Sequence, residues 1–355
     1  SSFLPLLPLP KQAKTLEHVI FAGFTHDQAL LLSLKLTQFL PGNMSKIFYS
    51  DNGSTAVEVA LKIAIQYWQN KNMPKSKVVG FQGAYHGDTF GAMSAAGKTR
   101  FTKPFWNYLF PVESIPLPLK GFEERSIAAF LALAKKGDVA CFIFEPLIQC
   151  AGGMRIYSAQ ALDRLLEICC AYEIIAIADE VATGFGRTGP LFAGEHLQHS
   201  ADITCLSKGI TGGFVPLGAT ACQEHIYEAF LSHDPTTIFL HGHSYTGNPI
   251  ACAAGLASFE LTLASGSQRA WIEAEHHKFC HKWKGHPSLK RSQVLGTILV
   301  LECKMSAPDY EYFLSHHIVI RPLGDVVYVL PPYCISQEEL NLIYNVLETF
   351  LCKNY

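Results

Sequence analysis

Four short apolar segments between residues 77 and 207 constrain the fold of this chain most strongly. Each segment is an unbroken apolar run, and amphipathic helical patterns lie between them. Strands that are buried on both faces of a parallel sheet have this pattern, because helices cover both faces of such a sheet. The segments are KVVGF (77–81), VACFIF (139–144), IIAIA (174–178) and ITCLS (203–207). The pattern predicts an α/β domain built on a mostly parallel central sheet.

The rest of the chain divides around this sheet. Residues 1–45 are expected to form an N-terminal arm and a helix, with the proline-punctuated stretch 1–15 irregular. Residues 46–258 are expected to form the large domain. After residue 258 the pattern changes to a polar helix, alternating strands and a final helix, which predicts a smaller α+β domain over 259–355. Within it, VLGTILVLEC and HIVIRPLGDVVYVLPP are expected to supply alternating strands and a hairpin.

Composition excludes several kinds of partner. Charged residues make up only 16% of the chain, the formal net charge is −2, and there is no basic run, which argues against nucleic acid. No uncharged apolar stretch suits a transmembrane helix, so no membrane association is expected. The 11 cysteines are scattered without a CxxC pair. This usage predicts reduced thiols in a cytoplasmic protein and no metal site.

Residues that directly follow the strands are the first candidates for a site, because ligands of open parallel sheets bind beyond the carboxyl ends of the strands. Residues 51–54, Asp-Asn-Gly-Ser, follow a short strand at 46–50 and open a helix. The amides of Gly53 and Ser54 suit a phosphate, although an ordinary helix cap explains the same residues. Thr55 and Glu58 have the spacing of a capping box at this helix start.

Three further side chains follow strands at the same edge. Tyr85 stands beside His86 in a glycine-rich turn, where it stacks on a planar ligand or simply packs in the turn. Asp179 ends one apolar run, and Lys208 follows the next. A lysine at a buried sheet edge can act as a nucleophile toward a carbonyl, unlike an ordinary solvated lysine. The combination suggests pyridoxal phosphate (PLP), with Lys208 as the Schiff-base lysine and Asp179 holding the pyridine nitrogen protonated.

The segments IADEVATGFGRTGPLFAGEH (177–196) and ADITCLSKGITGG (201–213) closely resemble the signature of class III PLP-dependent aminotransferases. The resemblance implies the fold of type I PLP enzymes. Within that class, several further segments resemble the biotin-synthesis enzymes that convert 8-amino-7-oxononanoate to 7,8-diaminononanoate with S-adenosylmethionine as amino donor. These segments are SDNGSTAVEVALKIAIQYW, AYHGDTFGAMS, EPLIQCAGGMRIY, HGHSYTGNPIACAA and IRPLGDVVYVLPPY.

The resemblance implies a role for each residue that matches the family's cofactor site. Lys208 is the Schiff-base lysine and later the general base for the proton shift. Asp179 pairs with the pyridine nitrogen. Gly53 and Ser54 bind the phosphate, and Tyr85 lies near the cofactor ring and the substrate.

The same resemblance implies two residues outside the central strands. Ser244 stands where the family has a threonine that reaches the phosphate of the neighbouring subunit, which implies a homodimer with shared active sites. Arg321 matches the arginine that binds the substrate carboxylate, for which a bidentate guanidinium is suited. His243 replaces a usual proline and is given no chemical role. Glu180 is expected to serve structure, and Arg187 to brace its loop or the subunit interface.

The sequence is also compatible with two other functions. One is a class III ω-aminotransferase with a different amino donor, since GFGRTG and SKGITGG do not separate the two activities. The other is a non-catalytic relative, because SSFLPLLPLPKQAKT stands where the family carries a longer N-terminal portion with aromatic residues that wall the substrate pocket. The presence of Lys208 and Asp179 favours an enzyme, since packing requires neither residue.

Overall fold

A seven-stranded sheet forms the centre of the computed structural model, which describes residues 8–99, 102–304 and 309–353. Its strand order is β1-β9-β8-β7-β4-β2-β3, and only β9 runs antiparallel to its neighbours. The predicted mostly parallel α/β sheet is confirmed. The strands are β1 (Met44–Ser50), β2 (Lys77–Phe81), β3 (Val112–Ile115), β4 (Val139–Phe144), β7 (Ile175–Asp179), β8 (Ile203–Leu206) and β9 (Gly218–Gln223).

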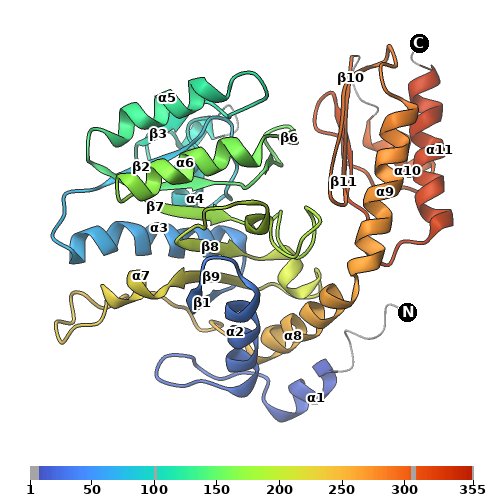
Figure 1. Ribbon diagram of the computed structural model, residues 1–355. Helices are drawn as coiled ribbons and strands as arrows, with labels where there is room; N and C mark the ends of the chain where they lie inside the picture. The colour runs from blue at the N-terminus through green and yellow to red at the C-terminus, as the bar shows by residue number, and fades with distance from the viewer. Residues whose placement is uncertain (1–7, 100–101, 305–308, 354–355) are drawn as a thin grey trace.

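Helices cover both faces of this sheet (Figure 1). On one face lies α3 (Gly53–Asn70), and on the other lie α5 (Glu123–Ala134) and α6 (Ala159–Ala171). From Cys141 onward, successive residues of β4 alternate between the two faces: Cys141 and Ile143 join the core beneath α3, while Phe142 and Phe144 join the core beneath α5 and α6. Both faces of the strand are therefore buried, which explains its unbroken apolar sequence.

At the β1–β9 end, the sheet packs against α2 (Asp27–Phe39) and α8 (Pro249–Ala264). The expected irregular stretch 1–15 is wrong for its described part, because Pro8–Thr15 forms the helix α1. Residues 1–7 lie outside the described residues. Proline is compatible with the first turn of a helix, and Leu9 is buried against Ala253 and Ala254 of α8. Tertiary packing thus supports a helix that its prolines obscure in the sequence.

A second, antiparallel sheet lies toward the C-terminus, with strands β10 (Leu289–Leu295), β11 (Ile298–Cys303) and β12 (Val326–Val329). It packs with α9 (Gly266–Lys282), α10 (Tyr310–Ser315) and α11 (Gln337–Lys353). The expected hairpin is confirmed, since β10 and β11 pair antiparallel and β12 pairs with β11, but the part of HIVIRPLG at 317–322 forms no strand and only the bridge Leu323–Val326 precedes β12. Pro322 interrupts this segment. The domain boundary at residue 259 stays a prediction.

Short elements complete the chain. They are α4 (Phe90–Ala95), α7 (Glu224–Glu228), the two-stranded hairpin β5 (Ile148–Gln149) and β6 (Arg155–Ile156), and the 3₁₀ helices η2 (Lys103–Phe105), η3 (Ala193–His196) and η4 (Lys208–Thr211). The β5–β6 hairpin packs on the second sheet through Ile148, Ile298 and Val300. Among the described helices, none is by itself long and apolar enough to cross a membrane; α8 and α9 meet the criterion only as a pair, bent by 61°.

Candidate active site

The start of α3 presents backbone amides at the carboxyl edge of the large sheet. Asn52 caps this helix: its Oδ1 accepts from the Thr55 amide at 3.0 Å, and Thr55 Oγ1 accepts from the Asn52 amide at 3.1 Å. The capping box is therefore Asn52–Thr55, and the expected box of Thr55 with Glu58 is wrong. The cap leaves the amides of Gly53 and Ser54 at the helix start, where they suit an anion.

Glu58 instead attaches the neighbouring glycine-rich turn to α3. Its Oε1 accepts from Thr89 Oγ1 at 2.5 Å and from the Gly91 amide at 2.7 Å. The same turn contacts Ser54, whose Oγ accepts from the Asp88 amide at 3.2 Å. A Cβ on Gly87 would overlap Ser54 Oγ, so the close approach of the turn requires glycine there.

The ends of β1, β7 and β8 converge at Gly53. A Cβ on Gly53 would lie 2.7 Å from Val181 Cγ1 and 3.6 Å from Ser207 Cβ. Because β7 and β8 are parallel neighbours with Asp179 opposite Cys205, Asp179 and Lys208 both stand at this edge. The topology thus brings together three of the segments that the sequence nominated.

Asp179 is buried and bound on both oxygens. Its Oδ2 lies 2.7 Å from His86 Nδ1, and its Oδ1 accepts from the Val181 amide at 3.1 Å. Burial alone would lower the pKa of His86, but the hydrogen bond and charge of Asp179, together with the charge of Glu145, raise it above its ordinary value. The pair therefore favours an imidazolium beside a carboxylate. The sequence alone predicts no role for His86, although its place next to Tyr85 in a strand-end turn is a signal.

Glu145 follows β4 and joins two loops of the site. Its Oε1 accepts from the Tyr85 amide at 3.1 Å, and its Oε2 accepts from the Cys150 amide at 3.0 Å. Burial raises the pKa of Glu145 to about 7, and the charge of Asp179 adds to this. The Tyr85 side chain is 42% exposed, and its Oη donates to Asp88 at 3.0 Å, so the ring borders open space at the edge.

Lys208 opens η4 directly after β8. Its φ of +41° lies in the left-handed region, which is uncommon for a residue with a Cβ. The side chain is exposed, while the flanking Ser207 and Ile210 are buried. Burial raises the pKa of Cys150, and the positive charge of Lys208 opposes that rise, so the charge of Lys208 acts on the loop that follows β5.

Arg321 and Ser244 lie on the periphery of these residues. Arg321 is exposed on the smaller domain, and its charge lowers the pKa of Tyr328, which burial raises. Tyr328 and Cys150 pack against the same apolar cluster, so the charge of Arg321 acts on a residue packed beside the hairpin that follows β4. Ser244 lies in an exposed loop, where the adjacent His243 Nε2 is 3.9 Å from Asp51 Oδ1.

Glu180 and Arg187 have structural contacts. Glu180 is buried, and its carboxylate accepts from the amides of Ala193 and Gly194 at 2.7 and 2.8 Å. Burial raises the pKa of Glu180 to about 7. Arg187 Nη1 donates to the Pro331 carbonyl at 2.7 Å. Both observations agree with the structural expectation for these residues.

The residues at this edge fit PLP. The α3 amides and Ser54 Oγ suit its phosphate, the buried Asp179 suits a protonated pyridine nitrogen, and the Lys208 amine suits its aldehyde. Glycine at position 87 lets the turn pack closely on Ser54, whose Oγ accepts from the Asp88 amide at the helix start.

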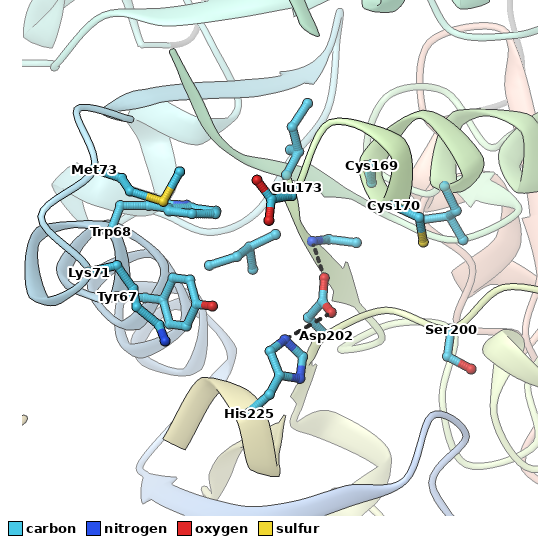
Figure 2. A pocket seen from close by; sticks show the side chains of 14 residues that line it. Tyr67, Trp68, Lys71, Met73, Cys169, Cys170, Glu173, Ser200, Asp202 and His225 are labelled. Carbon is cyan, nitrogen blue, oxygen red and sulfur yellow. Dashed lines mark hydrogen bonds and ion pairs between the residues drawn. The ribbon is translucent and has the colours of Figure 1, made fainter. Parts of the chain in front are cut away.

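A separate cavity of about 390 Å³ opens at the opposite edge of the sheet, before β7 and β8 begin (Figure 2). Its polar lining includes Asp202 and His225, whose Oδ1 and Nε2 are 3.6 Å apart, and the Tyr67 hydroxyl points toward Asp202. The lining does not include Lys208 or Asp179. This cavity is therefore distinct from the candidate active site.

The model of the aminotransferase class-III family matches residues 8–351. The chain belongs to this family.

Among its relatives is the adenosylmethionine-8-amino-7-oxononanoate aminotransferase of Synechococcus elongatus, which is 44% identical over 97% of this chain and 85% of the relative. The enzyme of the same name from Helicobacter pylori is 35% identical over 94% of this chain and 80% of the relative. The crystal structure of the Methanocaldococcus jannaschii enzyme of that name has a TM-score of 0.88 at 31% identity, covering 97% of this chain and 84% of that one. A PLP-bound amine transaminase from an uncultivated Pseudomonas species has a TM-score of 0.89 at 26% identity, covering 98% and 86%.

Proposed function

We propose that this protein is the PLP-dependent aminotransferase of biotin synthesis that converts 8-amino-7-oxononanoate to 7,8-diaminononanoate with S-adenosylmethionine as amino donor. The observation that carries the proposal is the convergence of Lys208, Asp179 and the α3 amides at one edge of the sheet. The relatives that bear this activity in their name, at 34–44% identity over nearly the whole chain, support the choice of substrate.

The cofactor supplies an aldehyde that takes up the amino group and a ring that accepts electrons from the substrate. The residues of the chain bind and orient it. Gly53 and Ser54 hold the phosphate at the helix start, and Asp179 keeps a proton on the pyridine nitrogen by its negative charge. His86 Nδ1 lies 2.7 Å from Asp179 Oδ2 and fixes the orientation of this carboxylate. With the cofactor bound, the Lys208 amine would be suited to take a proton from the substrate carbon and return it, as a general base and acid.

The substrate side of the site draws on both domains. Arg321, exposed on the smaller domain, is suited to bind the carboxylate of the oxo acid through its planar guanidinium. Tyr85 borders the opening at the end of β2 and is placed to contact both ring and substrate.

We further propose a homodimer in which Ser244 reaches the cofactor phosphate of the partner subunit. The exposed loop that carries Ser244 also exposes the large apolar side chains of Leu240 and Tyr245, at 77% and 66%, which supports contact with a second copy. A cytoplasmic location is proposed as well. Its support is that the cysteines are free thiols, as is usual in a reducing compartment.

Half-reaction spectroscopy tests the function. The purified protein loaded with PLP should show the visible absorption band of the lysine-bound cofactor, and Lys208→Ala should abolish it. S-adenosylmethionine alone should bleach the wild-type band. Bleaching by ω-amino acids but not by S-adenosylmethionine would instead assign the amine transaminase activity of the structurally similar Pseudomonas enzyme.

A further inference from the structure

The loop 184–189 lies between the large sheet and the smaller domain (Figure 1). Three contacts attach it to the smaller domain. Thr297, in the β10–β11 turn, donates its amide to the Arg187 carbonyl at 3.0 Å. Arg187 Nη1 donates to the Pro331 carbonyl at 2.7 Å. Arg269 of α9 donates Nη1 to the Gly189 carbonyl at 2.7 Å. The smaller domain therefore fixes this loop from several elements at once.

Tyr333 is at the centre of these contacts. Two guanidinium groups lie near its ring, with Arg187 Cζ 4.8 Å and Arg269 Cζ 6.0 Å from the centroid. Such cation–π contacts restrain the orientation of the ring. The hydroxyl is thereby aimed at the loop, where Oη donates to the Phe185 carbonyl at 2.8 Å.

Phe185 transmits this restraint to the lysine segment. The residue is buried and has a φ of +57°, a left-handed conformation that persists for a bulky residue only when its surroundings enforce it. Its side chain lies directly on the residue after the lysine, since a Cβ on Gly209 would be 2.8 Å from Phe185 Cβ. Any shift of the Phe185 backbone would therefore move the packing against Gly209.

Lys208 itself has the other left-handed conformation at this contact, with a φ of +41°. The large domain holds its neighbours, because Ser207 Oγ donates to the Leu217 carbonyl at 2.7 Å and Ser258 Oγ donates to the Gly209 carbonyl at 3.0 Å. Phe185 packs against Gly209, the residue that follows Lys208. A strained residue needs such support from all sides to keep one conformation.

We propose that Tyr333 is a positioning residue for Lys208, acting through the hydrogen bond from its Oη to the Phe185 carbonyl. The assignment rests on the proposed function of Lys208. Through Tyr333, the smaller domain, which carries Arg321, also sets the conformation of the lysine on the large domain.

The experiment compares two cofactor forms on the full chain with Tyr333→Phe, which removes only the hydroxyl. PLP carries an aldehyde that condenses with the lysine amine and releases water, whereas pyridoxamine 5′-phosphate has the same ring and phosphate but makes no bond to Lys208. The Kd for PLP should weaken about fivefold, comparable to one neutral hydrogen bond. The Kd for pyridoxamine 5′-phosphate should stay unchanged.

Tyr312→Phe is the matched control, because Tyr312 Oη also donates to a backbone carbonyl of the smaller domain, that of Val346 at 3.3 Å. It should change neither Kd. Equal weakening of both cofactors by Tyr333→Phe would indicate general structural damage and overturn the proposal, as would no change in either. A wild-type protein that binds no PLP would instead overturn the proposed function.

Discussion

Two histidine–aspartate pairs stand at opposite edges of the same sheet, and they differ in every physical respect that matters. At the carboxyl edge, the His86 and Asp179 side chains are 0% and 5% exposed and approach to 2.7 Å. At the amino edge, the His225 and Asp202 side chains are 50% and 25% exposed and remain 3.6 Å apart. Charges interact strongly only where water is excluded, and exposed pairs contribute little. Residue types alone therefore do not define a site; burial and strand direction do.

The largest expected contrast is in catalysis. Asp179→Asn removes the negative charge that holds the pyridine nitrogen protonated, and kcat/KM should fall about 100-fold or more. Asp202→Asn, the same change at the other edge, should leave kcat/KM within about twofold. Steady-state rates with S-adenosylmethionine and the oxo acid measure both. Equal losses of kcat/KM in the two variants would contradict the assignment of the active site to the carboxyl edge of the sheet.

A steric comparison comes next. Gly87→Ala would place a Cβ against Ser54 Oγ and displace the phosphate cradle, so the Kd for PLP should weaken about tenfold or more. Gly137→Ala, before β4 at the amino edge, is the matched control, since Gly137 also has a positive φ but no heavy atom within 4 Å of the added Cβ. It should strain the backbone without changing the Kd. Titration with PLP measures the Kd of both variants. A similar Kd in the two would show that glycine at position 87 is needed only for its backbone conformation and not for the phosphate site.

The histidines should differ more modestly. His86→Asn removes a charge-assisted hydrogen bond to Asp179, and kcat should fall about tenfold with little change in KM. His225→Asn should have less than a twofold effect, because its contact with Asp202 is long and exposed. A larger loss for His225→Asn than for His86→Asn would reverse the assignment of the two pairs.

The smallest effects should appear in stability against pH. The pKa of His86 is raised in the folded protein, so its stabilising contribution is complete below about pH 6.5, the unfolded value, and is lost as pH rises through the folded pKa. Burial raises the pKa of Asp202, so ionising it costs stability only above about pH 3.9, the unfolded value. Relative to wild type, Asp202→Asn should gain stability as pH rises above about 3.9, whereas His86→Asn should be less stable at low pH and lose this deficit as pH rises above about 6.5. Urea unfolding midpoints measured across pH test this prediction. It would be contradicted if the stability differences of the two variants from wild type changed over the same pH range.

The strands and the lysine were predictable because they depend on local sequence. Unbroken apolar runs gave β2, β4, β7 and β8 within about one residue, and the strand-end rule led to Asp179 and Lys208. Such patterns carry their information within a few residues.

Features that depend on distant partners were not predictable in the same way. The helix α1 depends on contacts with α8, and the roles of Glu58 and His86 depend on residues 31 and 93 positions away. The predicted capping box of Thr55 with Glu58 is wrong because Asn52, three residues before Thr55, is the cap instead. Its side chain accepts the Thr55 amide that the predicted box assigned to Glu58. The sequence also gave no sign of the cavity at Asp202, since its lining comes from four separate segments of the chain.

The attachment of the loop 184–189 to the smaller domain has a consequence for the order of folding. The partners of this loop, Thr297, Pro331 and Tyr333, are synthesised long after β7 and β8. The parallel sheet can assemble beforehand, because its strands all precede residue 224. If Tyr333 positions Lys208 as proposed, the lysine segment would reach its final conformation only once the C-terminal third of the chain has folded onto it, and capture of the cofactor would be a late event in the maturation of each molecule.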